Sequence, residues 1–230
     1  MKVIYFATIV VLFLCFSACH KDDVLVTEDK RMAVFATLLD SNNVALQDLA
    51  VNVTTKVGEE NNVLGASHSK ALGKVDFVSL VAYNRGIVVN FNPLSSGDHN
   101  PNFMSLSYVD PREFMDREES VNLDLVKLNP IQDVDISIDR LPETDSVEFR
   151  IQYYNTTQFI SLDEENNPIG KYQNTSNTYE RLDEETASFQ NSYRLPVGSP
   201  IKILYTVNDE AEKDTTITVN SANSIIDLEF

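Results

Sequence analysis

Carboxylates are the side chains of this chain that could most readily do chemistry, since its 230 residues include 35 Asp and Glu but only three His and two Cys. Two carboxylates that face each other across a cleft can serve as the acid and base of a glycoside hydrolase. Several carboxylate oxygens in one loop can hold a calcium ion. Four short runs supply such groups, namely Asp116/Glu118/Glu119, Asp163/Glu164/Glu165, Asp183/Glu184/Glu185 and Asp209/Glu210/Glu212.

The four acidic runs favour a solvated surface over catalysis. Each run is contiguous and loop-like, and the chain has no Trp, whereas glycoside hydrolysis needs separated carboxylates in a cleft lined with aromatic side chains. Asp163, Glu164 and Glu165 stay open as a calcium candidate, although their spacing does not match an EF-hand loop. Apart from that candidate, we expect no metal site.

Other catalytic groups are sparse. His20, His68 and His99 do not form the His-x-x-x-His spacing of a zinc site. The chain has no Gly-x-Ser-x-Gly motif, no phosphate-binding glycine loop and no dinucleotide fingerprint. Ser67 precedes His68, but neighbours in a strand point to opposite faces. We therefore expect a protein that is not an enzyme, with no catalytic residue and no cofactor.

Aromatic side chains gather in the second half of the chain among Asn, Thr and Gln. Such a mixture is typical of surfaces that contact glycans or proteins. The alternative is that the rings fill a core, which the alternating pattern favours for Tyr153. A glycan or protein ligand is therefore a hypothesis for this region, whose aromatic residues are Tyr153, Tyr154, Phe159, Tyr172 and Tyr179.

The N-terminus has the pattern of a secretory signal. Lys2 precedes an unbroken apolar run from Val3 to Phe16, and the small residues Ser17 and Ala18 follow it. The run is too short to cross a hydrocarbon core of ~30 Å as a helix. The sequence therefore predicts that residues 1–18 are a cleaved signal peptide.

Phe16-Ser17-Ala18-Cys19 resembles the lipobox of bacterial lipoproteins. The resemblance implies that Cys19 is diacylated with palmitate-type chains, becomes the new N-terminus and anchors the protein in a membrane. Two or three acyl chains anchor a protein stably, and residues 19–30 would then be a lipidated tether. An ordinary signal peptide with a chance cysteine is the alternative.

The residues after Cys19 resemble the export signal of surface lipoproteins in Bacteroidetes-type bacteria, a cysteine followed by Lys21, Asp22 and Asp23. The resemblance implies an outer-membrane lipoprotein that faces the cell surface, with the periplasmic face as the alternative. A polar, solvated tether would explain the same residues. The formal net charge of −17 argues against a nucleic-acid partner, which requires basic patches.

Hydrophobic residues alternate with polar ones in many short segments, and no stretch holds a helical period. Val134 to Ile138, Val147 to Tyr153 and Ile201 to Val207 are the cleanest examples. Asn129-Pro130 interrupts the pattern and marks a boundary. The sequence therefore predicts an all-β protein of two consecutive antiparallel, transthyretin-like or immunoglobulin-like β-sandwiches, over residues 31–128 and 131–230.

The first predicted sandwich resembles the transthyretin-like, carboxypeptidase-regulatory type of domain over residues 31–92. The resemblance is carried by Phe35 to Asp40, by Asn43 to Val53 and by Gly73 to Leu80. Val44 and Ala45 stand where that family usually has Gly and Pro. The resemblance implies a fold and no activity.

These features favour a non-enzymatic, surface-exposed lipoprotein that binds or displays something on the outer membrane. One alternative is a fimbrillin-like or pilus-anchoring structural subunit that assembles by strand exchange, with the alternating last strand Ile225 to Phe230 as the exchanged segment. Another is an accessory lipoprotein of an outer-membrane uptake system. The oligomeric state and the identity of a ligand stay open at this point.

Overall fold

The structure of the chain is a computed structural model that describes residues 24–57, 62–112, 119–220 and 224–230. In these residues nearly every element is a strand, and a short 3-10 turn, η1 (Ala71–Gly73), precedes β4. The strands are β1 (Val26–Asp40), β2 (Ala50–Thr54), β3 (Gly65–His68), β4 (Lys74–Ala82), β5 (Ile87–Phe91), β6 (Ser105–Asp110), β7 (Ser120–Leu128), β8 (Ile131–Asp139), β9 (Val147–Leu162), β10 (Pro168–Leu182), β11 (Ser188–Pro196), β12 (Pro200–Val207), β13 (Lys213–Thr218) and β14 (Ile225–Glu229).

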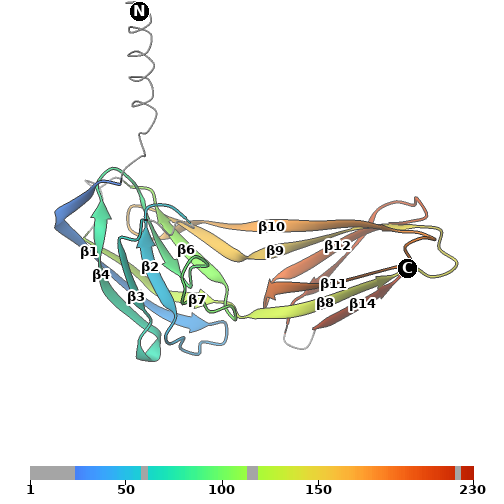
Figure 1. Cartoon of the computed structure of the whole chain (residues 1–230), viewed down its shortest axis with the longest axis horizontal. Coiled ribbons are helices and arrows are strands. Elements are labelled where there is room, and N and C mark those ends of the chain that lie inside the picture. Colours follow the sequence, from blue (N-terminus) through green and yellow to red (C-terminus); the bar gives the residue numbers. More distant parts are fainter. Residues whose placement is uncertain (1–23, 58–61, 113–118, 221–223) are drawn as a thin grey trace, which may run out of the picture.

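The described strands form three sheets, and two sandwiches lie end to end (Figure 1). One three-stranded sheet has the order β4-β1-β7, and the other has the order β11-β8-β14. An eight-stranded sheet runs through both sandwiches in the order β13-β12-β9-β6-β5-β2-β3, with β10 paired to β9. The all-β prediction is confirmed. The sheets are mixed rather than purely antiparallel, because β1 with β7, β6 with β9 and β8 with β14 pair in parallel.

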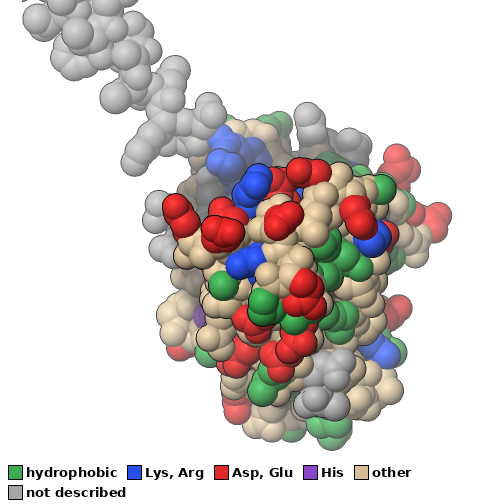
Figure 2. Space-filling view, turned by 90° about the vertical axis from the view of Figure 1, so that its right-hand side faces the viewer, with side chains coloured by type: hydrophobic (Ala, Val, Ile, Leu, Met, Phe, Trp, Pro, Cys, Tyr) green, Lys and Arg blue, Asp and Glu red, His purple; other side chains and the backbone are tan. Residues whose placement is uncertain are grey.

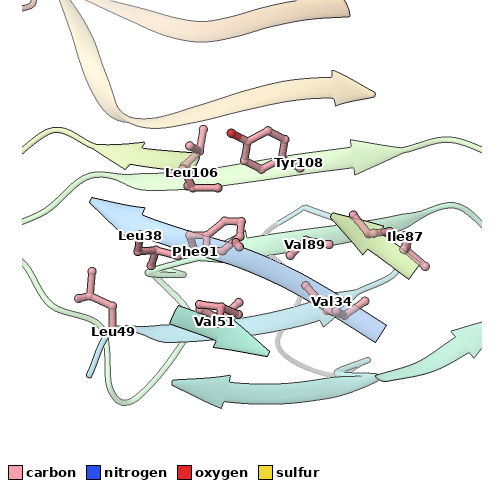
Figure 3. Close-up of a cluster of buried hydrophobic side chains, with 14 of the residues drawn as sticks. Val34, Leu38, Leu49, Val51, Ile87, Val89, Phe91, Leu106 and Tyr108 are labelled. Carbon is pink, nitrogen blue, oxygen red and sulfur yellow. The ribbon is translucent and has the colours of Figure 1, made fainter. Parts of the chain in front are cut away.

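The core of the first sandwich lies between β1, β4 and β7 on one side and β2, β5 and β6 on the other (Figure 3). Val34 and Leu38 of β1 point into it and are fully buried, whereas Phe35 between them is 44% exposed. Met32 to Leu39 is a dense apolar run in the sequence, and the natural expectation of a strand buried on both faces is wrong, because its residues are buried alternately. Burial alternates with period two because only one face of this sheet has a second sheet against it.

The outer face of β2, β5 and β6 carries polar side chains, and these are buried. Asn90 Nδ2 donates to Asn52 Oδ1 at 2.8 Å and to Thr54 Oγ1 at 3.0 Å, while Ser107 Oγ donates to Asn90 Oδ1 at 2.6 Å. A buried polar group costs little when its hydrogen bonds are made. Polar alternation in the sequence therefore marks this ladder of hydrogen bonds rather than contact with water.

The second sandwich follows the predicted alternation closely. Ile136 and Ile138 of β8 pack against Phe149 and Ile151 of β9 in a core that is closed to solvent. The last strand, β14, pairs with β8 of its own chain and buries Ile226. The segment considered for exchange with another subunit therefore completes its own sandwich.

β9 and β10 form a long hairpin that belongs to both sandwiches. Residues 147–152 of β9 pair with β12, residues 157–161 pair with β6, and β10 follows β9 along nearly its whole length. In the second sandwich Phe149 and Ile151 face the core. In the first sandwich Ile160 and Leu162 face the core. The buried side of β9 thus changes from odd-numbered to even-numbered residues. The two halves meet at an irregularity in the pairing, where β9 contains two more residues than the facing part of β10.

Two expected boundaries differ from the structure. Residues 24–30 were predicted to be tether, but β1 begins at Val26, Val24 packs on the first core and Tyr83 N donates to Leu25 O at 2.7 Å. Pro130 does separate the two hydrophobic cores along most of the chain. However, the hairpin carries residues 157–171 of the predicted second domain back into the first sandwich.

Candidate functional site

A polar groove lies at the junction of the two sandwiches, and we call it the junction groove. Its volume is about 430 Å³. The hairpin, the linker between the sandwiches and the turn between β11 and β12 form its walls. The lining residues are Met104, Asn129, Tyr154, Gln158, Lys171, Gln173, Pro196, Gly198, Ser199 and Pro200.

Backbone hydrogen bonds fix the linker wall of the groove. Met104 N donates to Asn129 O at 3.0 Å, which ties the linker to the first sandwich. Val197 N donates to Pro130 O at 2.8 Å, which ties the same linker to the second. Gly198 has a φ of +87°, a left-handed conformation that glycine adopts without steric cost. The groove is therefore a fixed part of the junction and not a gap across a loose hinge.

Gln158 lines the junction groove, and its amide has no hydrogen-bond partner among the residues that the structure describes. The side chain is 7% exposed and faces the same side of β9 as Ile160 and Leu162. Among the described residues, the buried side-chain atom that lacks a hydrogen-bond partner is Thr55 Oγ1. The amide of Gln158 therefore opens onto the groove, where water or a ligand can reach it. Its neighbour Gln173 differs, because Gln173 Nε2 donates to Asn155 O at 2.9 Å.

The junction groove has a charge unlike that of the rest of the chain. Its lining includes Lys171 and no Asp or Glu, although the chain has 35 acidic and 18 basic residues. A second hollow of about 270 Å³ adjoins it and shares Tyr154 and Pro200. This hollow is lined by Lys202 and again by no carboxylate, while Lys202 Nζ lies 3.3 Å from Asp214 Oδ2.

Arg112 fastens the tip of the hairpin to the first sandwich. Its guanidinium donates to Asp110 Oδ1 at 2.8 Å and to Asp110 Oδ2 at 3.0 Å, and the side chains are 9% and 1% exposed. It also donates to Asn166 Oδ1 at 2.6 Å and to Glu164 O. One buried ion pair thus holds the β9–β10 turn in place.

The calcium candidate lies in this β9–β10 turn, where the carboxylate of Asp163 already accepts hydrogen bonds. Asp163 Oδ1 accepts from Glu165 N at 2.9 Å and from Asn167 N at 2.7 Å. These bonds, that from Asn167 N foremost, lower the pKa of Asp163 below its usual 3.8. Asp163 therefore caps the turn. The described residues contain no group of three or more His, Cys, Asp or Glu that could hold a metal ion.

Two of the remaining acidic runs lie at the end of the second sandwich that faces away from the first (Figures 1 and 2). Asp183 Oδ1 accepts from Glu185 N at 3.0 Å and from Thr186 N at 3.1 Å, so this run also caps a turn. Glu210 pairs with Lys213 at 3.0 Å in the turn between β12 and β13. Neither run lines the junction groove.

The predicted lipidation site and export signal lie outside the described residues. They comprise Cys19 with Lys21, Asp22 and Asp23, and the signal peptide 1–18 lies there too. Residues 113–118, which include part of the first acidic run, are likewise not described. Within the described ranges, no helix is both long and apolar enough to cross a bilayer.

The aromatic residues singled out in the sequence do not share one site. Tyr153 packs on Tyr193 in the second core, with ring centroids 5.0 Å apart, as its alternation predicted. Tyr172 and Tyr179 are exposed on β10. Among the five, the residue that lines the junction groove is Tyr154. The groove residues Gln158 and Lys171 gave no sequence signal, because isolated Gln and Lys residues in polar strands are common.

No known protein family and no curated protein matches this chain. Similar solved structures include the Bacillus anthracis TIE protein, with 12% identity over 87% of this chain and 34% of that one and a TM-score of 0.32. This chain therefore spans about a third of that protein's length. The shaft pilin SpaA from Lactobacillus rhamnosus GG has 10% identity over 87% of this chain and 97% of that one, with a TM-score of 0.29.

The major pilin subunit of Bacillus cereus is similar at the same level, with 8% identity over 87% of this chain and 99% of that one and a TM-score of 0.29. Likeness at this level carries no statement about function.

Proposed function

We propose that this chain is a non-enzymatic lipoprotein, anchored through Cys19, that holds two joined sandwiches at the cell surface as a binding and display module. The observation that supports it best is the eight-stranded sheet shared by both sandwiches. β9 has 16 residues and extends about 50 Å at ~3.3 Å per residue. A bend at the junction would break the ladder between β9 and β10, so the module acts as one stiff body.

Protease treatment of intact cells tests this function. Wild type is compared with Cys19→Ser and with a variant in which Lys21, Asp22 and Asp23 are replaced by Ala. We expect wild type to be cleaved on whole cells, the triple variant to be protected, and Cys19→Ser to leave the membrane fraction. Protection of wild type would contradict surface display, and an unanchored wild type would contradict lipidation.

A structural subunit that assembles by strand addition is the second candidate function, and the free edge of β10 favours it. Among the described strands β10 pairs with β9 alone. Its eight residues from Tyr172 to Tyr179 carry no charge, whereas exposed edges that avoid pairing usually carry one. This edge replaces β14 as the candidate assembly strand, because β14 is paired within its own chain.

Sedimentation over a hundredfold range of protein concentration tests the second candidate, using wild type and a variant with Asn174→Lys and Asn177→Lys. Both residues are exposed on β10. Association that is concentration-dependent in wild type and lost in the variant would support strand addition. A wild type that stays monomeric throughout would exclude assembly of this chain with itself.

A further inference from the structure

We propose that the junction groove binds a saccharide that carries a carboxylate, such as a uronic acid. This inference rests on the proposed binding role and adds the class of ligand. It draws on three features of the groove: an amide that opens onto it without a protein partner, a local charge opposite to that of the chain, and a tyrosine between two hollows.

The amide of Gln158 is the first feature. It can donate two hydrogen bonds and accept two, and the described residues satisfy none of them. Its atoms are not among the buried, unpartnered ones, so they face the space of the groove. A ligand hydroxyl pair in the groove would satisfy the donor and the acceptor together. An occupant that displaced water from this amide without replacing its hydrogen bonds would lose affinity, so this part of the groove selects a ligand rich in hydroxyl groups.

The charge of the lining is the second feature. Lys171 lies at the groove without an ion-pair partner among the described residues, and no carboxylate lines the groove. The net charge of −17 repels anions at long range. Attraction to a carboxylate must therefore act at short range, well inside the Debye length of ~8 Å at physiological salt. Lys171 provides this contact, which a neutral sugar would leave unused.

Tyr154 is the third feature. It lines both the junction groove and the adjoining hollow, whose volumes are about 430 and 270 Å³. An aromatic side chain between two hollows offers a platform with an apolar body and a polar tip. Two linked sugar rings can then occupy the two hollows, one on each side of the tyrosine. The second hollow contributes Lys202, which is already paired with Asp214.

Calorimetric titration of the purified full chain with digalacturonate, and with its dimethyl ester as an uncharged match, tests the proposal. We expect digalacturonate to bind and the ester to bind at least about tenfold more weakly, the scale of one lost charged hydrogen bond. Lys171→Met should remove the difference between the two ligands. Equal binding of both ligands to wild type, or binding of neither, would overturn the proposal.

A second variant separates ligand recognition from folding. Gln158→Met keeps the length of the side chain and removes the amide that opens onto the groove, so it should leave the melting temperature of the free protein close to that of wild type and weaken digalacturonate binding about tenfold. Gln190→Met, on the exposed surface of β11, should change neither. A Gln158→Met variant that binds as wild type would contradict the role of the amide. Failure of binding would leave the surface-display result standing, because cell-surface cleavage is measured without ligand.

Discussion

The two halves of β9 show how one strand can serve two cores. In the second sandwich β9 lies between β10 and β12, and both neighbours are antiparallel to it. In the first sandwich β9 lies between β10 and β6, and β6 runs parallel to it. Phe149 is buried in the second core and Leu162 in the first.

The difference between the two halves of β9 shows what makes the junction rigid. Parallel pairing requires a long connection, and here the whole of β7 and β8 lies between β6 and β9. The chain therefore passes from the first sandwich to the second and then returns through the hairpin. Arg112 fastens the returning end. We infer that the two sandwiches unfold as one cooperative unit, and the predictions below test whether the halves of β9 are coupled.

The largest expected effect follows from emptying the second core. Phe149→Ala should lower the free energy of unfolding by about 3–5 kcal/mol, because it removes a fully buried ring and leaves a cavity. If the halves are coupled, hydrogen exchange should accelerate in the first sandwich as well. Phe35→Ala, at a position 44% exposed, is the control and should have a small effect. Acceleration limited to the second sandwich would contradict the coupling.

The next effect comes from the buried ion pair. Arg112→Met should lower the free energy of unfolding by about 3 kcal/mol, because it removes the guanidinium that neutralises the buried carboxylate of Asp110. Arg181→Met removes an exposed pair with Glu148 and should cost less than about 1 kcal/mol. Chemical denaturation measures both. Similar losses in the two variants would show that the hairpin tip does not depend on Arg112.

A smaller loss of unfolding free energy is expected from a change at the end of β9 that packs in the first core. Leu162→Ala should cost about 2–3 kcal/mol, because the residue is buried but ends the strand beside a turn that can relax. Leu125→Ala, at an exposed position of β7, serves as the control. A double variant that combines Leu162→Ala with Phe149→Ala gives the sharpest comparison, because its loss of unfolding free energy can be set against the sum of the two single losses. Losses that add fully indicate distant, independent sites, and losses that do not add indicate direct coupling.

The smallest effect concerns the cap of the hairpin turn. The pKa of Asp163 is lowered below its usual 3.8, so its charged form is favoured in the folded state. That contribution is complete above the unfolded pKa and is lost as the pH falls through the folded pKa. At pH 7 wild type should therefore be slightly more stable than Asp163→Asn. This difference in stability, the gap, should close below pH 3.8. Thermal melts against pH measure the gap, and a gap that widens in acid would contradict the cap.

The sequence predicted the strands of the second core well but missed most of the hairpin. Val134 to Ile138 and Ile201 to Val207 alternate cleanly, because one face meets the core and the other meets water. β10 was not recognised, since its free edge and exposed faces leave no hydrophobic period between Tyr172 and Tyr179. The second half of β9 was missed because its buried side changes after Tyr153.

The groove was beyond prediction for a related reason. Gln158 and Lys171 come together only because the hairpin returns to the first sandwich, and no local pattern in the chain marks that return. In contrast, the boundary at Pro130 was visible, since proline interrupts an alternation that resumes after it. Local signals thus located the strands and the linker, while the parallel contact of β9 with β6 depends on packing across many residues.

Hydrogen exchange of the native protein in mild denaturant tests the central claim most directly. It reports the opening free energy of residues 147–153 and of residues 157–162 of β9 separately. If one shared sheet unites the sandwiches, both segments should open only in the global unfolding step and with the same free energy. Two distinct opening free energies, with one sandwich unfolding while the other stays protected, would contradict the account.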